Sequence, residues 1–149
     1  METINLLKSG EKEGIVLPKR KIGIINFSTS TLNQDRLVAK IHIDGLFAGI
    51  FYNPGDEWRS FKILRGEVPK VEELMDYDTL ILSGSSLSVN KMPQQMQHFQ
   101  EVLAEAMKVN KKLKVIGLCF GHQFLAHSQK IEVVTKPLNR GLLNINLSL

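Results

Sequence analysis

Short apolar runs and one long amphipathic stretch alternate along the chain. An apolar run that stops at small or polar residues is typical of a buried strand, and the sequence has four: residues 21–27, 58–64, 79–82 and 112–116. Between the last two, apolar residues recur every three or four positions over 93–109, which predicts an amphipathic helix with Pro93 in its first turn. The pattern therefore alternates strand and helix.

The remaining segments are less regular. Residues 32–52 predict a broken helix that ends at the turn signal 53–56, and Val68-Pro69 leads into a short helix. Residues 1–18 are polar without a sustained period, so we expect a flexible leader before a domain at 19–149. The tail, 131–149, predicts two strands, and the second alternates apolar with polar residues (Leu143, Ile145, Leu147 and Leu149 against Asn144, Asn146 and Ser148).

Strands that alternate with helices predict an α/β fold in which helices cover both faces of a mostly parallel sheet, a three-layer sandwich. Ligands of such sheets bind beyond the carboxyl ends of the strands. The small-residue loop Ser83–Ser86 and the segment that starts at Gly117 each follow a predicted strand. We therefore expect these two segments to meet at one crevice.

Composition and charge exclude several classes of protein. A length of 149 residues fits one domain, and no apolar run approaches the eighteen or so residues of a membrane span. The net charge of +4 is not gathered with aromatic residues into a basic face, so we expect no nucleic-acid partner. One cysteine forms no internal disulfide, and the N-terminus lacks a signal-type apolar core; both features favour the cytoplasm.

The most informative motif is the run Gly117-Leu118-Cys119-Phe120-Gly121-His122-Gln123, at the junction of a predicted strand and a predicted helix. A strand, a sharp turn and a helix form a nucleophile elbow, in which glycines two residues before and after the nucleophile avoid collisions within the turn. The N-terminus of a helix also favours the thiolate, the nucleophilic form of cysteine. The alternative is that Cys119 is a small buried hydrophobic residue.

This run resembles the elbow of the class I glutamine amidotransferases, G-x-C-x-G-x-Q, at every specified position. Further segments resemble the γ-glutamyl peptidase branch of that family, and together they extend over about residues 20–135: residues 56–61, 66–69, 77–78 and 83–86. The resemblance implies a flavodoxin-like fold and a cysteine that attacks the γ-carbonyl of glutamine or a γ-glutamyl peptide. A thioester would form, and water would release glutamate.

The resemblance also assigns roles to individual residues. Cys119 would be the nucleophile, and the backbone N–H groups of Ser85 and Phe120 would stabilise the oxyanion. Gln123 and Gly84 would contact the glutamyl part of the small-molecule substrate. Gly117 and Gly121 would shape the elbow, and His122 would be structural. No metal or other cofactor is implied.

One part of the family pattern is missing. The family base is a histidine, with an acidic partner two residues later, many tens of residues beyond the elbow, but only 30 residues follow Cys119. Beyond the elbow motif they hold one histidine, His127, which lies on the elbow helix about 12 Å from the cysteine, too far for a base. We expect no catalytic role for His98 or for His42, although His42-Ile43-Asp44 superficially resembles such a pair.

The chain therefore resembles a C-terminally truncated member of the family. We expect its sheet to be incomplete at the C-terminal end, and the exposed edge strand to cause self-association.

Several functions fit this sequence. The first is a γ-glutamyl hydrolase that works only when another chain supplies the histidine and acid. The second is a γ-glutamyl-binding or regulatory module without turnover, and the third is a fragment of a longer enzyme. A competitor on the same fold is the cysteine-elbow hydrolase and chaperone superfamily, in which an upstream acid assists the thiol; Gln123 and the loop Ser83–Ser86 favour the amidotransferase.

Overall fold

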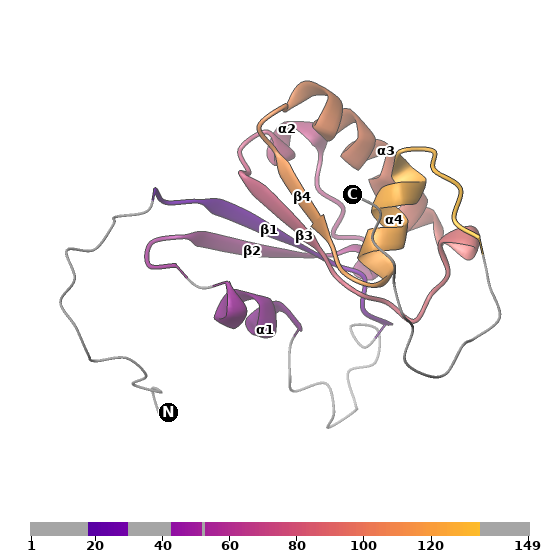
Figure 1. The fold of residues 1–149 in the computed structure, drawn as a ribbon, viewed down its shortest axis with the longest axis horizontal. Coiled ribbons are helices and arrows are strands. Elements are labelled where there is room, and N and C mark those ends of the chain that lie inside the picture. The colour runs from indigo at the N-terminus through magenta and orange to yellow at the C-terminus, as the bar shows by residue number, and fades with distance from the viewer. Residues whose placement is uncertain (1–17, 30–42, 52, 135–149) are drawn as a thin grey trace, which may run out of the picture.

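Four parallel strands form the centre of the molecule (Figure 1). The computed structural model describes residues 18–29, 43–51 and 53–134. The strands lie in the order β2-β1-β3-β4, and their bounds are β1 (Lys21–Asn26), β2 (Glu57–Lys62), β3 (Thr79–Leu82) and β4 (Lys114–Gly117). This order matches the first four strands of the flavodoxin-like arrangement. The prediction of an α/β fold with a parallel sheet is confirmed.

Helices lie on both faces of this sheet (Figure 1). The helices are α1 (Ile43–Ile50), α2 (Val71–Leu74), α3 (Gln94–Val109) and α4 (Phe120–Ser128), with 3-10 turns η3 (Ile63–Arg65) and η4 (Val89–Lys91). Successive strand residues face opposite ways, so Leu80 and Leu82 pack toward α3 and α4 while Ile81 packs with Phe47 of α1. Covered faces explain why β1 and β3 are nearly continuous apolar runs.

Four aromatic rings fill the core beneath the carboxyl ends of the strands. Phe27 follows β1, Phe99 lies on α3, and Phe120 and Phe124 lie on α4; each is at most 1% exposed. The ring centroid of Phe27 lies 5.3 Å from that of Phe120 and 4.7 Å from that of Phe124. Such edge and tilted arrangements are the favoured geometries for aromatic pairs. This cluster anchors the start of α4.

The second strand is shorter than the sequence predicts. The predicted run 58–64 becomes β2, which ends at Lys62, followed by the 3-10 turn η3. Ile63 and Leu64 are both buried, which two successive residues of a half-exposed strand do not achieve because their side chains face opposite ways. Gly66, with φ +83°, ends the turn.

Smaller corrections concern element ends. Pro93 is the residue before α3, where its carbonyl accepts the N–H groups of Met96 and Gln97, and does not lie in the first turn. The fourth strand begins at Lys114, after a turn at 111–112. Of the predicted helix over 32–52, the described part is α1.

The C-terminal predictions are tested only in part. Residues 131–134 form no strand, so the first predicted tail strand is wrong at its start. At the end of α4, Lys130 adopts φ 61°; the N–H of Lys130 donates to His127 and that of Ile131 to Ala126, a Schellman motif. The leader 1–17, His42 and the tail from 135 onward lie outside the described residues, as does the predicted incompleteness of the sheet. No helix among the described residues is long and apolar enough to cross a membrane.

Candidate active site

The loops after β1, β3 and β4 meet at the carboxyl edge of the sheet. The N–H of Leu118, after β4, donates to the carbonyl of Leu82 at 3.0 Å. The N–H of Phe27, after β1, donates to the buried hydroxyl of Ser83 at 2.8 Å, and the hydroxyls of Thr29 and Ser86 lie 3.2 Å apart. The expected meeting of the small-residue loop and the elbow is therefore observed, and the loop after β1 joins them.

Cys119 lies at the bend between β4 and α4. It is the residue that caps the N-terminus of α4, and its carbonyl accepts the N–H groups of His122 at 3.0 Å and Gln123 at 3.3 Å. Its backbone angles are φ 53° and ψ −115°, a strained conformation for a residue with a side chain. The side chain is exposed. The interpretation of Cys119 as a small buried hydrophobic residue is therefore wrong, and the elbow geometry is present.

Gly117 and Gly121 permit this bend by close backbone contact. A Cβ on Gly117 would lie 2.6 Å from the carbonyl oxygen of Gly121. A Cβ on Gly121 would collide with the carbonyl oxygen of Leu82, and it would lie 2.7 Å from the carbonyl carbon. Real Cβ atoms do not approach backbone atoms so closely, so any other residue at either position must displace the elbow. The steric reason predicted for the glycine spacing is thus observed.

Gly84 lies close to the bend at Cys119. A Cβ built on Gly84 would lie 3.6 Å from the Cβ of Cys119 and 4.0 Å from the carbonyl oxygen of Leu118. The next residue, Ser85, uses its hydroxyl within the loop, where it accepts the N–H of Leu87 at 3.2 Å. The N–H groups of Ser85 and Phe120 donate to no acceptor in the described part of the chain. Neither N–H group is therefore engaged by another described residue.

Gln123 and His122 lie on the first turn of α4, and both side chains are exposed. Neither side chain makes a hydrogen bond within the described residues. They are therefore available to a ligand at the carboxyl edge, and nothing in their surroundings fixes a role for either.

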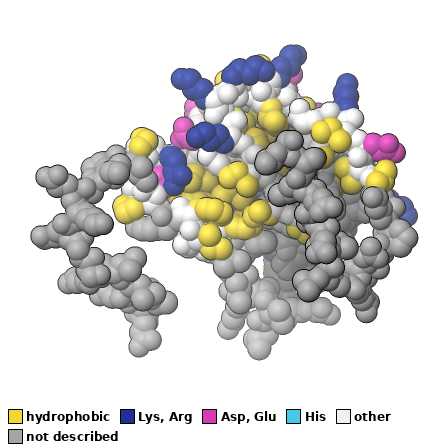
Figure 2. All heavy atoms as spheres, viewed as in Figure 1, with side chains coloured by type: hydrophobic (Ala, Val, Ile, Leu, Met, Phe, Trp, Pro, Cys, Tyr) yellow, Lys and Arg dark blue, Asp and Glu magenta, His cyan; other side chains and the backbone are white. Residues whose placement is uncertain are grey.

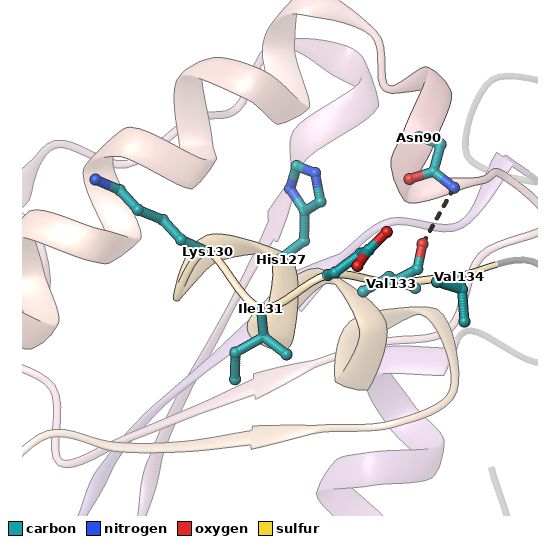
Figure 3. A pocket seen from close by; sticks show the side chains of 7 residues that line it. Asn90, His127, Lys130, Ile131, Val133 and Val134 are labelled. Carbon is teal, nitrogen blue, oxygen red and sulfur yellow. Dashed lines mark hydrogen bonds between the residues drawn. The ribbon is translucent and has the colours of Figure 1, made fainter.

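His127 lies near the far end of α4 and faces α3. Its Nδ1 lies 3.3 Å from Oε1 of Gln100, whose Nε2 donates to the carbonyl of His127 at 3.4 Å. His127 lines a depression of about 470 Å³ together with Asn90 and residues 130–134. Figure 3 shows these side chains around it. His98 is exposed on α3. Among the described residues, neither histidine side chain has a hydrogen bond to residues 117–123.

The groups with a shifted pKa lie at the opposite, amino-terminal edge of the sheet. The side chain of Arg20 donates twice to Asp56, and this hydrogen bonding lowers the pKa of the Asp56 carboxyl to about 2 and raises that of Arg20. Burial raises the pKa of Tyr77. Arg20 and Asp56 thereby join the start of β1 to the turn before β2. The described residues include no cluster of three or more potential metal ligands.

The hydroxyl of Ser83 is a feature that sequence reasoning missed. The side chain is buried; its Oγ accepts the N–H of Phe27 and donates to the carbonyl of Gly84 at 3.1 Å. The sequence marks Ser83 only as the first of several small residues in a loop. Its partner is 56 positions earlier, so only the pairing of β1 with β3 reveals the contact.

Comparison with known proteins identifies relatives. Gamma-glutamyl peptidase 4 of Arabidopsis thaliana is 30% identical over 84 residues, which are 56% of this chain and 33% of that protein. Gamma-glutamyl peptidase 5 of the same plant is 30% identical over 105 residues, 68% of this chain and 41% of that protein. Gamma-glutamyl peptidase 2 of the same plant is 29% identical over 109 residues, which are 68% of this chain and 41% of that protein. No protein-family model matches the chain, and no solved structure matches it significantly.

The predicted resemblance to the γ-glutamyl peptidases is confirmed as distant homology. The chain spans between a third and about two fifths of the length of these relatives.

Proposed function

We propose that this distant homologue of the γ-glutamyl peptidases binds γ-glutamyl compounds and that Cys119 attacks their γ-carbonyl carbon. One observation carries the proposal: Cys119 is exposed in a strained conformation at the N-terminus of α4, so close to the loop after β3 that a Cβ on Gly84 would lie 3.6 Å from its own Cβ. The names of the relatives refer to γ-glutamyl peptidases. Glutamine and γ-glutamyl peptides are the substrate class that we propose here.

The chemistry follows from the groups at the elbow. The thiolate of Cys119 forms a bond to the γ-carbon, and the carbonyl electrons move to the oxygen, where the N–H groups of Phe120 and Ser85 stabilise the negative charge. Collapse of this intermediate breaks the carbon–nitrogen bond; the nitrogen takes up a proton and leaves as ammonia or an amine. Water then attacks the thioester, which releases glutamate and restores the thiol. Gln123 and Gly84 contact the glutamyl part.

Proton transfer limits this reaction. A general base must lie within hydrogen-bond reach, about 3 Å, of the group whose proton it takes. The imidazole of His127 is instead hydrogen-bonded to Gln100, and His98 is exposed on another helix. We therefore propose that the chain alone forms the thioester slowly and does not turn over steadily. A histidine and an acid from another chain would complete the enzyme; without them the protein is a γ-glutamyl-binding or regulatory module.

A chloroketone analogue of glutamine tests the binding and the nucleophile together. Its ketone replaces the γ-amide, and displacement of chloride by Cys119 leaves a thioether that mass spectrometry detects. We expect labelling at Cys119 at least about tenfold faster than with a chloroketone that lacks the amino-acid group, and no labelling of Cys119→Ala. Equal rates with the two reagents would contradict a glutamyl site.

Turnover is measured separately, as release of glutamate and ammonia from glutamine. We expect none above the level of Cys119→Ala. Release that disappears in Cys119→Ala would contradict the inactivity of the isolated chain, and it would establish the hydrolase.

We also propose self-association through β4 and a cytoplasmic location. β4 is the last strand of the described sheet, and the side chains of Ile116 and Leu118 are 42% and 37% exposed. Figure 2 shows hydrophobic side chains gathered near the middle of the face in view, over the sheet. Size-exclusion chromatography with light scattering should show dimers or larger species, which Ile116→Lys should weaken; a stable monomer would contradict this part of the proposal.

A further inference from the structure

Ser83 lies between the two loops that flank the elbow. The residue is fully buried at the end of β3. Its hydroxyl accepts the N–H of Phe27 at 2.8 Å and donates to the carbonyl oxygen of Gly84 at 3.1 Å. Its own N–H donates to the carbonyl of Ile25 at 2.9 Å, which extends the pairing of β1 with β3. The hydroxyl of Ser83 is thus held in place by the backbone that follows β1, and it in turn holds the carbonyl of Gly84.

The bond to Gly84 determines how the following N–H points. The peptide group between Gly84 and Ser85 is planar and trans, because the described chain has no cis peptide bond. In a trans peptide the C=O and the N–H point in opposite directions. Since the carbonyl of Gly84 turns toward the buried hydroxyl of Ser83, the N–H of Ser85 turns away from it, out of the core.

We infer that Ser83 is a positioning residue that aims the N–H of Ser85 at the oxyanion formed beside Cys119. Three observations carry the inference: the Ser83 bond to the Gly84 carbonyl, the absence of any other acceptor for the Ser85 N–H among the described residues, and the approach of Gly84 to Cys119. It rests on the proposed function. Ser83 touches no substrate; it acts through the peptide group that follows Gly84.

The test compares two reactions of Cys119. The glutamine chloroketone carries a carbonyl oxygen that the Ser85 N–H polarises, whereas dipyridyl disulfide reacts with the same thiol and has no carbonyl. The measured quantity is the ratio of the two second-order rate constants. We expect Ser83→Ala to lower this ratio about tenfold or more, since loss of an oxyanion donor slows reactions by about 10²–10³. Ser83→Thr keeps the hydroxyl and should restore the ratio.

Ser128→Ala is the matched control. Ser128 is also buried, and its hydroxyl donates to the carbonyl of Leu125 at 2.7 Å, at the far end of α4. We expect the ratio of this variant to equal that of the original protein, because the lost bond lies away from the loop. A ratio that falls as far in Ser128→Ala as in Ser83→Ala would overturn the inference.

Further outcomes separate the inference from the proposed function. A ratio in Ser83→Ala that falls less than about tenfold, including an equal fall of both rates, overturns the role of Ser83 and leaves the glutamyl site intact. Absence of a glutamyl preference in the unmodified protein overturns the proposed function itself, and the inference with it. If Ser83→Ala does not fold, the amide proton of Ser85 is followed by NMR in the unmodified protein. A shift on chloroketone labelling supports the inference, and an unchanged resonance overturns it.

Discussion

Gly84 approaches Cys119 so closely that a Cβ on Gly84 would lie 3.6 Å from the Cβ of the cysteine. A methyl group at this position would make an ordinary van der Waals contact with Cys119, so the loop after β3 runs close beside the elbow after β4. Because Gly84 lacks a side chain, the volume of one methyl group beside Cys119 stays open. The two segments that come close here are 35 positions apart in the sequence.

Gly84→Ala should slow reactions of Cys119 without destabilising the fold. Gly84 has no left-handed φ and a new Cβ meets no atom closer than 3.6 Å, so we expect the free energy of unfolding to change by less than about 0.5 kcal/mol. The added methyl occupies space beside the thiol, and labelling by the glutamine chloroketone should fall about tenfold or more. Urea denaturation and labelling kinetics measure the two effects. Undiminished labelling would show that the ligand does not approach past Gly84.

Gly121→Ala should disrupt the elbow itself. The new Cβ would collide with the backbone of Leu82, and backbone atoms of two packed elements move only with loss of the neighbouring packing, at a cost of about 3 kcal/mol. Gly49→Ala in α1 is the matched control: its Cβ meets nothing within 4 Å among the described residues, and we expect a gain of about 0.5 kcal/mol from helix propensity. Urea denaturation of both variants measures the difference. Similar stability of the two would contradict the tight contact.

Cys119→Gly should stabilise the protein while it removes the thiol. The φ of 53° and ψ of −115° are strained for any residue with a Cβ, and glycine relieves about 1 kcal/mol of that strain. Cys119→Ala keeps the Cβ and should not show this gain. Lys130→Gly, at φ 61° beyond the end of α4, is a second position at which glycine should stabilise. Equal unfolding midpoints for Cys119→Gly and Cys119→Ala would show that the elbow holds no such strain.

The ion pair of Arg20 and Asp56 should make stability depend on acid pH. The Asp56 carboxyl has a pKa of about 2 in the folded protein, below its ordinary value of 3.8, because Arg20 bonds to the ionised form. A lowered pKa in the folded state contributes stability that is fully present above about pH 4 and is lost as the pH falls toward 2. Asp56→Asn should therefore unfold at lower urea concentration than the original protein at pH 7.

The measurement is the urea midpoint of both proteins between pH 2 and pH 7, and we expect the difference to shrink below pH 4. Asp76→Asn is the control, since the carboxylate of Asp76 is 73% exposed and lies 3.7 Å from the ammonium of Lys21. Ion pairs that are exposed to this degree contribute little to the free energy of unfolding. A pH-independent difference for Asp56→Asn would contradict the linkage.

The third strand and the elbow are the parts of the structure that the sequence predicts well. β3 and α4 follow from local patterns: an apolar run between polar residues, and a G-x-C-x-G turn whose glycines have one steric explanation. These signals are local, so the sequence is enough. The residue at which β2 ends is not determined by a local pattern. It depends on the burial of both Ile63 and Leu64 in the core, which packing against other elements determines.

The contacts within the candidate site are less predictable, for the same reason. The hydrogen bond from the N–H of Phe27 to the hydroxyl of Ser83 forms because β1 and β3 are neighbours in the sheet. The predicted elements alone do not say which strands pair. The contact between Gly84 and Cys119 follows once β4 is placed beside β3. Residue types at loop ends therefore indicate the site, while the strand order determines which side chains meet there.

Phe120 links the expected reactivity of Cys119 to the packing of the hydrophobic core. Its side chain is 1% exposed among the four aromatic rings, and its backbone N–H is the first of α4. Burial of a phenylalanine side chain contributes about 2 kcal/mol to stability. The position of the Phe120 N–H is therefore fixed by the packing of the same residue's ring in the core. Heating or mutation that loosens the aromatic cluster should therefore abolish reaction with glutamyl reagents before the protein unfolds, and sites deep in the interior should appear in a screen for impaired labelling.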